Sequence, residues 1–295
     1  MSHDPRRIRR RAAAGLGLLV ACLLLGLSAC RSLPSASAPL RVMTLNVRLP
    51  LDADGADHWT LRRDAMARLI GDTAPDLIGT QELMRSQADD LAARLPEYAW
   101  FGVGRRGGDS DEHMGIFYRR DAMRLLASGH FWLSDSPELP GSISWGHPYP
   151  RMVSWGLFER RADGLRLHLF NTHLPYRAED GDARLRGAGL ILQRLGAIAD
   201  GPAIVLGDFN DVPGGAVHRR LTAVLHDAWE QAPRREGPEG SFHGFTGTPG
   251  ARIDWVLSRG LQPLTARTLA QPVDGRHVSD HFPVLVEFAA QPPAR

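Results

Sequence analysis

The segment VLGDFNDVPGG, residues 205–215, ends an apolar run with polar residues that could do chemistry. Asp208 and Asn210 stand two residues apart, and this spacing places two side chains on the same face of an extended strand. An Asp or Asn after a strand is most often a turn former. Alone, the pair therefore indicates the end of a buried strand and does not identify a site.

Other apolar segments end in polar groups of the same kind. They contribute Asn46 in TLNV, Glu82 in GTQEL, His173 in NTHLPY, Asp254 in RIDWV, and Asp280 and His281 in SDHFPV. Taken singly, each has a structural explanation as a turn former, a solvated carboxylate or a hydrogen-bonded histidine. Together they form a set of carboxylates, amides and imidazoles without a thiol or a nucleophilic serine motif.

This set of donors favours a hard cation. Carboxylate and amide oxygens suit Mg²⁺ or Mn²⁺, whereas a zinc site more often gathers several His or Cys. Such a cation commonly acts on phosphate, where it neutralises charge on the transferred group and on the leaving oxygen. The two histidines and the remaining carboxylates would supply acid and base chemistry. Because the sequence contains no GxxxxGK loop, the pattern indicates metal-dependent phosphoester hydrolysis rather than a nucleotide-driven motor.

The elements that must position these residues are short apolar runs separated by amphipathic stretches. We predict strands over residues 41–47, 76–83, 98–104, 115–119, 154–160, 166–173, 203–209, 253–258 and 283–288. We predict helices over 59–72, 85–95 and 183–199, where apolar residues recur at helical spacing. Many strands with few helices favour two packed sheets with helices outside, in one domain over residues 40–290.

The ordered series TLNVR, TQE, NTHL, GDFND, RIDWV and SDHFPV resembles the endonuclease/exonuclease/phosphatase superfamily across residues 41–288. The resemblance implies a deoxyribonuclease-I-like four-layer α/β sandwich, with the site at one edge of its two sheets. It also implies that Asn46 and Glu82 bind the divalent metal, with Asp280 close to it.

The same resemblance implies a role for each remaining motif residue. Asp208 would orient or deprotonate the attacking water, and Asn210 would hold the scissile phosphate. His281 would contact a phosphate oxygen, with Asp254 behind it fixing its tautomer and stabilising its protonated form. His173 would donate a proton to the leaving oxygen or stabilise the charged transition state. Water would attack in line, without a covalent enzyme intermediate.

The substrate is less clearly indicated than the chemistry. GARIDWVL stands where inositol phosphatases show a PAWCDRIL-like segment, and no long hydrophobic hairpin supports a sphingomyelinase. A group of bacterial members has FWLS, SW…PR and FHGF stretches, which occur here in residues 131–151 and 240–247. Within these stretches, which read as loops, we predict substrate contacts for Arg151 and His243.

Three further features near these stretches have a structural interpretation. For Trp132 and Trp145, packing and substrate contact are equally favoured. For Phe242 and Phe245, core packing is the favoured interpretation. Residues 104–113, GRRGGDSDEH, read as a solvated loop, with substrate gating as the second interpretation.

The N-terminus has the anatomy of an export signal. RRIRRR is followed by the apolar stretch AAAGLGLLVACLLLGLSAC, in which LSAC resembles the lipobox of bacterial lipoproteins. We therefore predict a signal peptide over 1–29, lipidation of Cys30 and a tether over 30–39; a single membrane-spanning helix is the alternative. Arg31 after the Cys favours the periplasmic face of the outer membrane in a Gram-negative host.

Loss of residues 1–29 would change the charge of the protein. They hold five Arg and one Asp, so the net charge would fall from +2 to −2. A protein that binds nucleic acid nonspecifically usually carries an excess of positive charge. A net charge of −2 therefore does not favour a general nuclease, although a local basic patch would permit one. With Cys22 removed and Cys30 lipidated, no cysteine is left for a disulfide.

The sequence thus predicts an exported, monomeric, metal-dependent enzyme that hydrolyses a phosphodiester or a phosphomonoester. The first alternative is a nuclease that cleaves DNA or RNA. A sphingomyelinase-like phospholipid hydrolase and a catalytically inactive binding lipoprotein come after it. The last of these would be expected to lack some of the motif residues, and all of them are present.

Overall fold

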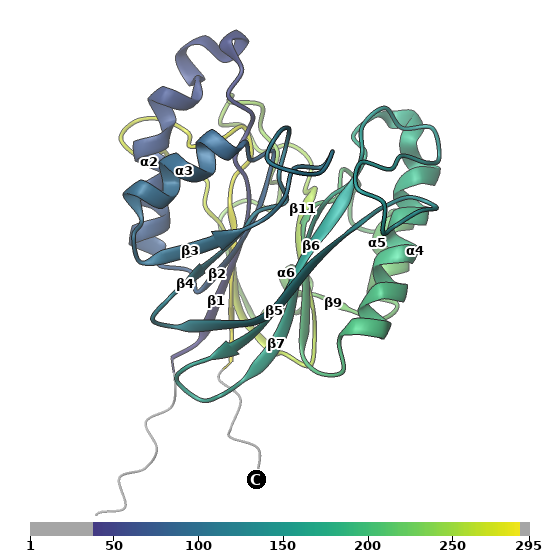
Figure 1. The fold of residues 1–295 in the computed structure, drawn as a ribbon. Helices are drawn as coiled ribbons and strands as arrows, with labels where there is room; N and C mark the ends of the chain where they lie inside the picture. Colours follow the sequence, from purple (N-terminus) through teal and green to yellow (C-terminus); the bar gives the residue numbers. More distant parts are fainter. Residues whose placement is uncertain (1–37, 290–295) are drawn as a thin grey trace, which may run out of the picture. The chain divides into compact units, whose positions relative to one another are not determined.

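Two β-sheets packed face to face form the centre of residues 38–289, the part of the chain that the computed structural model describes. Figure 1 shows helices on the outer side of each sheet. The predictions of a signal peptide and of a lipidated Cys30 fall outside this range. Inside it, no helix combines the length and the apolar character needed to cross a membrane.

The first sheet holds seven strands within residues 38–289, in the spatial order β10-β12-β13-β1-β2-β4-β3. Its strands are β1 (Leu40–Asn46), β2 (Leu77–Gln81), β3 (Tyr98–Phe101), β4 (Ile116–Arg119), β10 (Arg234–Glu236), β12 (Pro263–Thr268) and β13 (Val284–Phe288). The second sheet holds six strands in the same range, in the order β5-β6-β7-β8-β11-β9. Its strands are β5 (Met123–Trp132), β6 (Met152–Arg160), β7 (Arg166–His173), β8 (Ala203–Asp208), β9 (His226–Asp227) and β11 (Asp254–Arg259).

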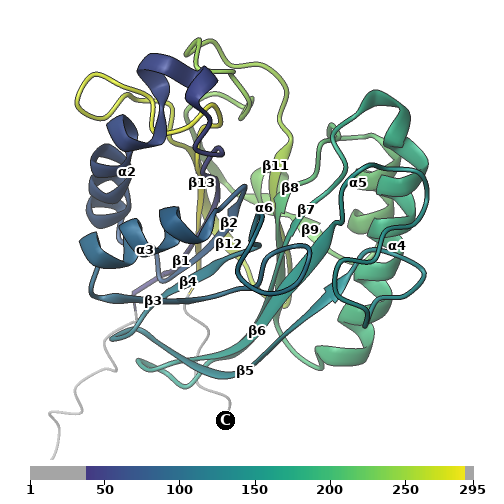
Figure 2. The same cartoon turned by 45° about the horizontal axis from the view of Figure 1, so that its top comes forward.

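Helices on both outer faces complete a four-layer sandwich. The helices within residues 38–289 are η1 (Asp52–Asp57), α2 (Trp59–Thr73), α3 (Arg85–Arg94), η2 (Ala178–Asp180), α4 (Gly181–Ile198), α5 (Ala216–Thr222) and α6 (Ala228–Gln231). The short α6 packs Ala228 and Trp229 into the core between the sheets. Figures 1 and 2 show α2 and α3 on the first sheet and α4 and α5 on the second. Met66 and Leu91 anchor the first pair, and Ile191 and Leu221 the second. The predicted four-layer α/β sandwich is confirmed.

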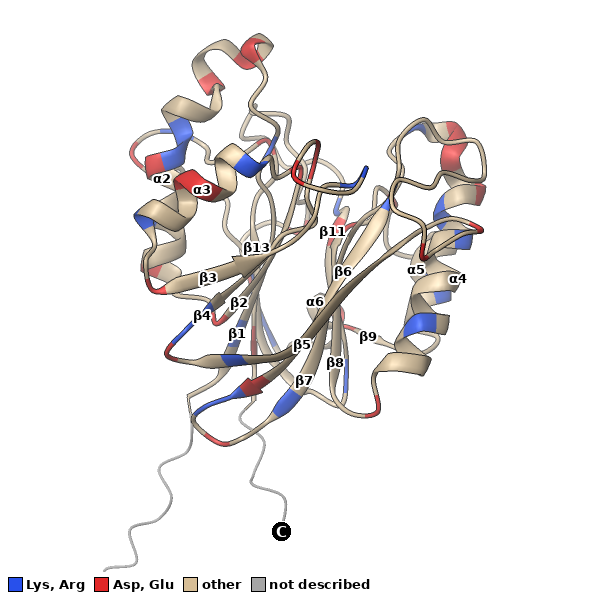
Figure 3. Cartoon of the chain, viewed as in Figure 1, with Lys and Arg blue, Asp and Glu red and all other residues tan. Residues whose placement is uncertain are grey.

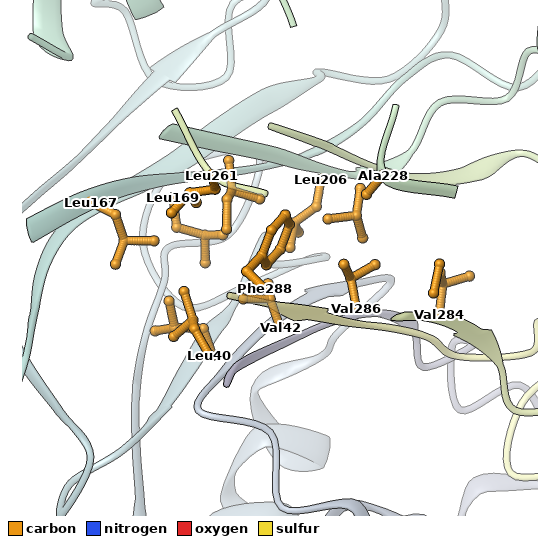
Figure 4. Close-up of a cluster of buried hydrophobic side chains, with 14 of the residues drawn as sticks. Leu40, Val42, Leu167, Leu169, Leu206, Ala228, Leu261, Val284, Val286 and Phe288 are labelled. Atoms are coloured by element: carbon orange, nitrogen blue, oxygen red, sulfur yellow. The ribbon is translucent and has the colours of Figure 1, made fainter. Parts of the chain in front are cut away.

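The central strands are buried on both faces. In β1, Val42 faces the second sheet, whereas Met43 packs among α2 and α3. Figure 4 shows the cluster between the sheets, to which Leu169, Leu206 and Phe288 belong. Figure 3 shows that charged residues gather on helices and in loops, while the strands are mostly uncharged. Strands buried on two sides read as continuous apolar runs, which is why the sequence predicts them well.

Strand directions bring the polar strand ends to one edge of the sandwich. β1 and β2 are parallel, with Asn46 opposite Gln81, and β7 and β8 are parallel, with His173 opposite Asp208. β11 is antiparallel to β8, so its first residue, Asp254, also lies opposite Asp208. Residues that are far apart in the sequence therefore meet at the same edge.

The glycine of the GDFN motif is needed because β7 and β8 approach closely. Gly207 has φ +148°, and a Cβ there would lie 1.9 Å from the carbonyl oxygen of Thr172. A larger residue would push the strands apart. Because Asp208 follows directly, the glycine also sets the position of that carboxylate.

All of the predicted strands and helices are present, but the sequence pattern misses several further elements. The three predicted helices are present, with ends shifted by no more than two residues. The sequence pattern does not predict β5, and the segment 131–151 that reads as a loop begins inside that strand. β5 is an edge strand whose residues 124–130 are exposed or half-buried, so it lacks the apolar run of a central strand. β9, β10, β12, α5 and α6 are likewise missed.

Candidate active site

A pocket of about 570 Å³ is lined by the strand ends at this edge. The predicted site residues that line it are Glu82, Arg151, His173, Asp208, Asn210, Asp280 and His281. Asn46 and Asp254 lie directly behind the lining residues and are hydrogen-bonded to them. The sequence pattern therefore brings together nearly all of the residues that it singles out.

Glu82 and Asp280 line the pocket, and Asn46 lies directly behind Glu82; we call these three residues the acidic wall. Asn46 Nδ2 donates to Glu82 Oε1 at 3.1 Å and to Asp208 Oδ2 at 3.2 Å. The backbone N–H of Leu49 donates to Glu82 Oε2 at 3.1 Å. These contacts fix the orientation of Glu82 and leave further lone pairs on its oxygens.

The composition of the acidic wall fits a hard divalent cation. Its three residues offer carboxylate and amide oxygens, which Mg²⁺ and Mn²⁺ prefer as ligands. Burial raises the pKa of Asp280, and the neighbouring Glu82 carboxylate adds to the rise, while His281 opposes it. A cation bound between the two carboxylates would relieve this repulsion. Asn46, Glu82 and Asp280 are therefore the candidate metal ligands.

His281 forms a buried pair with Asp254, whose Oδ2 lies 2.8 Å from His281 Nδ1. Burial alone would lower the pKa of His281, but the carboxylates of Asp254 and Asp208 outweigh it and raise the pKa to about 10. At neutral pH both ring nitrogens therefore carry protons. Although these three residues place ligand atoms within 4.8 Å of one another, a protonated imidazole cannot bind a metal. The group is suited to contact an anion.

Asp208 lies between two imidazoles that are in different states. Its Oδ2 is 3.5 Å from His173 Nε2 and 3.9 Å from His281 Nε2. Burial first, and the charge of Asp254 second, raise the pKa of Asp208 to about 7. Burial, followed by the charge of Arg151, lowers the pKa of His173 well below its usual value, so this ring is neutral. A carboxylate with a pKa near 7 is suited to take a proton from water.

Three pocket residues adopt the left-handed backbone conformation that side chains disfavour. Arg48 has φ 57°, Glu82 has φ 56° and Asn210 has φ 49°. The backbone N–H of Asn210 donates to Asp208 Oδ1 at 3.0 Å, and its Nδ2 donates to the carbonyl of Leu174 at 3.0 Å. Such strain persists only where surrounding contacts enforce it, and it is common at functional sites.

Comparison with known proteins identifies the family. A model of the endonuclease/exonuclease/phosphatase family matches residues 43–281. The chain belongs to this family. The resemblance seen in the sequence motifs is thereby confirmed.

Solved structures of the family include relatives at more than 30% identity. An endonuclease/exonuclease/phosphatase family protein from Bacteroides thetaiotaomicron is 31% identical, with a TM-score of 0.82 over 88% of this chain and 100% of that chain. The mannosyl-6-phosphatase Bt3783 from B. thetaiotaomicron VPI-5482 is 32% identical, with a TM-score of 0.79 over 85% of this chain and 99% of that chain.

More distant members share the fold alone. The human Nocturnin catalytic domain is 19% identical, with a TM-score of 0.69 over 88% of this chain and 96% of that chain. Among curated sequences, an uncharacterized protein of Acanthamoeba polyphaga mimivirus is 22% identical over 254 residues, which are 70% of this chain. The match spans 36% of the viral protein, so this family domain corresponds to about a third of its length.

The pocket of this family member has a second wall, of which the sequence pattern predicts only Arg151. We call Arg105, Glu112, Tyr149 and Arg151 the second wall; all four line the pocket. Glu112 Oε1 lies 2.7 Å from Arg105 Nη1, and its Oε2 lies 3.9 Å from His173 Nδ1. Burial raises the pKa of Glu112 to about 6.

The interpretation of residues 104–113 as a solvated loop is therefore wrong for Arg105 and Glu112, which are buried. A signal was present in the sequence. Glu112 stands just before the predicted strand 115–119, and Glu82 likewise stands at the end of a strand. A carboxylate at a strand end deserved the same interpretation in both segments.

His243 and Phe242 occupy each other's expected places. His243 does not line the pocket; it is buried, and its ring stacks on Phe282 with 3.9 Å between ring centroids. Phe242, predicted to be in the core, is 40% exposed and lines the pocket. Neighbouring residues in an extended segment point in opposite directions. The position of His243 thus argues against the predicted substrate contact.

A buried arginine behind the acidic wall joins two of its loops. Arg62 of α2 donates to the carbonyl oxygens of Val47 at 2.9 Å, Arg48 at 3.1 Å and Val278 at 2.6 Å. These carbonyls belong to the segment that leaves β1 and to the segment that precedes Asp280. One guanidinium therefore sets the spacing between two parts of the candidate metal site.

Proposed function

We propose that the protein is a divalent-metal-dependent phosphoesterase that hydrolyses a small phosphoester by in-line attack of water. The observation that carries the proposal is the position of Asp208. It is hydrogen-bonded to Asn46 of the acidic wall and lies within 4 Å of both His173 and His281. Ion pairs with a purely structural role also shift pKa values. A carboxylate whose pKa is near 7, beside a charged imidazole in a pocket, is nevertheless typical of a catalytic site.

The residues divide the reaction between them. A divalent cation on the acidic wall would neutralise charge that develops on the phosphate oxygens. Asp208 accepts the proton of the attacking water, and His281, held by Asp254, donates a hydrogen bond to a phosphate oxygen. Asn210 keeps one amide N–H for the phosphate beyond its bond to the Leu174 carbonyl.

The proton and bond balance is that of a hydrolysis. The water oxygen forms a new bond to phosphorus as the bond to the leaving alcohol breaks, and Asp208 takes the proton of the water. The neutral His173 donates a hydrogen bond to the leaving oxygen, and a phosphate dianion in the pocket would favour its protonated form. The protonated His173 gives its proton to the leaving oxygen and regains one from Asp208, whose Oδ2 lies 3.5 Å from His173 Nε2. The products are phosphate and an alcohol.

Among phosphoesters, the proposal favours phosphomonoesters of small molecules over nucleic acids. A relative that is 32% identical is a mannosyl-6-phosphatase. The volume of about 570 Å³ is that of a pocket for a single small molecule. Without residues 1–29 the net charge would be −2, which does not favour general binding of a polyanion.

The proposal includes export to the cell envelope through lipidation of Cys30. The LSAC motif and the preceding apolar stretch support it. In a Gram-negative host we expect the protein on the periplasmic face of the outer membrane. In cell fractionation the native protein should sediment with membranes, and Cys30→Ala should release it; the same distribution for both would contradict lipidation.

The activity is tested on the purified protein with Mg²⁺ or Mn²⁺. The substrates are p-nitrophenyl phosphate, bis-p-nitrophenyl phosphate and plasmid DNA, and Asp208→Asn serves as the blank. We expect hydrolysis of the monoester that is lost in the blank and in a chelator. DNA cleavage lost in the same two controls would instead identify a nuclease, and hydrolysis that persists in the chelator would contradict the metal.

A further inference from the structure

Four buried polar atoms around the second wall have no hydrogen-bond partner within residues 38–289. One of them, Arg105 Nε, lies 3.0 Å from Asp111 Oδ1 in an ion pair. The other three are Glu112 Oε2, Arg151 Nη1 and His173 Nδ1, and all three residues line the pocket. Glu112 is 5% exposed and Arg151 is 4% exposed. Buried polar groups without partners are costly and rare in folded proteins. Three of them in one pocket indicate a place where a ligand supplies the partners.

The second wall is held rigidly from behind. The backbone N–H of Arg105 donates to the Glu112 carbonyl at 2.8 Å, in addition to the 2.7 Å pair between their side chains. The Arg105 guanidinium lies over the ring of Tyr149, 4.6 Å from its centroid. Trp132 Nε1 donates to the Arg105 carbonyl at 2.6 Å. Arg105 is thus engaged within the wall, and the free atoms are those of Glu112 and Arg151.

Glu112 and Arg151 offer an acceptor and a donor to one ligand group. Burial lowers the pKa of Arg151, and Glu112 is the carboxylate that opposes this most strongly, because the two charges are close. An alcohol oxygen satisfies both, since it accepts a hydrogen bond from Arg151 and donates its hydrogen to Glu112. A second anionic group would meet repulsion from Glu112, and an apolar group would leave both atoms unpaired.

The pocket lining also includes exposed aromatic rings. Tyr176 is 55% exposed and Phe242 is 40% exposed, and both line the pocket. Aromatic faces pack well against the C–H groups of a ligand that is polar elsewhere. The pocket therefore combines hydrogen-bonding groups with apolar surface.

We propose that the second wall is a hydroxyl-binding subsite, and that the substrate is the phosphomonoester of a polyhydroxylated alcohol such as a sugar. The inference rests on the proposed phosphoesterase function. The acidic wall takes the phosphate, and hydroxyl groups near the leaving oxygen bind Glu112 and Arg151. Selectivity for the alcohol is then separate from the chemistry at phosphorus.

The test compares glucose 6-phosphate with n-hexyl phosphate, two primary phosphate esters that differ in the hydroxyl groups. The purified protein should prefer the sugar phosphate at least tenfold in kcat/KM, because an ester without hydroxyl groups leaves Glu112 and Arg151 without hydrogen-bond partners. Glu112→Gln and Arg151→Met should each reduce this preference several-fold or abolish it. Arg106→Met is the matched control: Arg106 is next to Arg105, does not line the pocket and pairs with Asp111 outside it, so the preference should stay unchanged.

The possible results separate this inference from the proposed function. If neither ester nor p-nitrophenyl phosphate is hydrolysed, the proposed function fails. If both esters are hydrolysed at equal kcat/KM, the second wall binds only water. That result refutes the hydroxyl subsite and leaves the proposed phosphoesterase function intact. Preference for glucose 1,6-bisphosphate that disappears in Arg151→Met would identify an anion site and overturn the hydroxyl assignment.

A second measurement does not depend on the variants being folded. Free glucose lacks the phosphate, so it should inhibit hydrolysis of p-nitrophenyl phosphate competitively in the native protein, whereas n-hexanol should not. Equal inhibition by the two alcohols, or none by glucose at concentrations up to its solubility limit, would contradict a hydroxyl subsite.

Discussion

The acidic wall and the second wall use similar residues in opposite ways. Near the acidic wall, His281 is fixed by Asp254 at 2.8 Å and is kept charged by it. At the second wall, His173 is 3.9 Å from Glu112, beyond hydrogen-bond distance, and is neutral. The difference teaches that a histidine whose charge is set in advance has a carboxylate partner within the protein, whereas a histidine that changes its protonation state when substrate binds keeps one ring nitrogen free.

The largest effect is expected for Asp208→Asn, which removes the carboxylate between the two histidines. We expect kcat to fall by about 10²–10⁴-fold, because the amide cannot accept the proton of water. Because burial and Asp254 raise the pKa of Asp208, its charged form opposes folding, so the variant should melt no earlier than the native protein. Steady-state kinetics and thermal unfolding measure both effects, and unchanged activity would exclude Asp208 as the base.

A pair of substitutions compares the partners of the two histidines directly. Asp254→Asn should lower kcat about 100-fold with p-nitrophenyl phosphate, because His281 loses the carboxylate that keeps it charged. Glu112→Gln should lower kcat less than tenfold with this substrate, because Glu112 does not hold His173 tightly. An equal fall in kcat in the two variants would show that the acidic wall and the second wall do not differ in function.

The sequence predicted the acidic side of the site because its residues follow strands buried on two faces. Asn46 and Asp208 each end an apolar run, and strand direction alone brings such ends to one edge. His243 shows the limit of this argument, since a shift of one residue in an extended loop changes which side chain reaches the pocket.

The second wall is only partly predictable from local patterns, which indicate Arg151 and offer the position of Glu112 just before a strand as a signal. Arg105 and Glu112 come from a segment rich in Gly, Asp and Ser, which resembles an exposed loop. Their burial results from contacts with Trp132 and Tyr149, which lie in other segments. No spacing rule connects these residues, so they appear only when the chain is folded.

An intermediate effect is expected for Arg62→Lys, which tests how the acidic wall is positioned. Lysine cannot reach three carbonyls with the planar fork of arginine, so the loops around the candidate metal site should loosen. We expect the Mg²⁺ concentration for half-maximal activity to rise about tenfold, with kcat restored by excess Mg²⁺. Arg63→Lys is the control, because Arg63 is also on α2 but pairs with Asp90 of α3. A loss of kcat that Mg²⁺ does not restore would contradict this role.

The smallest effect contrasts His281 with a histidine that lacks a carboxylate partner. Burial lowers the pKa of His130 in β5 to about 4, and its Nδ1 lies 2.9 Å from Ser154 Oγ. Between pH 6.5 and 4 the unfolded chain binds a proton that the folded protein does not. Acidification over this range should therefore reduce the free energy of unfolding, by up to about 1.4 kcal/mol for each pH unit from this residue.

Urea unfolding between pH 4 and 6.5 measures that slope in the native protein and in His130→Gln. In the variant, the free energy of unfolding should change less steeply with pH, and the remaining dependence comes from other buried histidines. An identical slope in both proteins would mean that His130 is protonated in the folded state and that burial does not decide its charge.

The pairing of β1 with β13 determines when the site can first work. Ser279 Oγ donates to the Asn46 carbonyl at 2.6 Å across a sequence separation of 233 residues. At about 5–20 residues per second, a ribosome delivers the second partner roughly 10–50 s after the first. Until then Asn46 and Glu82 have neither Asp280 nor His281 beside them. A chain in which β13 has not yet joined β1 should therefore lack the proposed activity, wherever the protein folds.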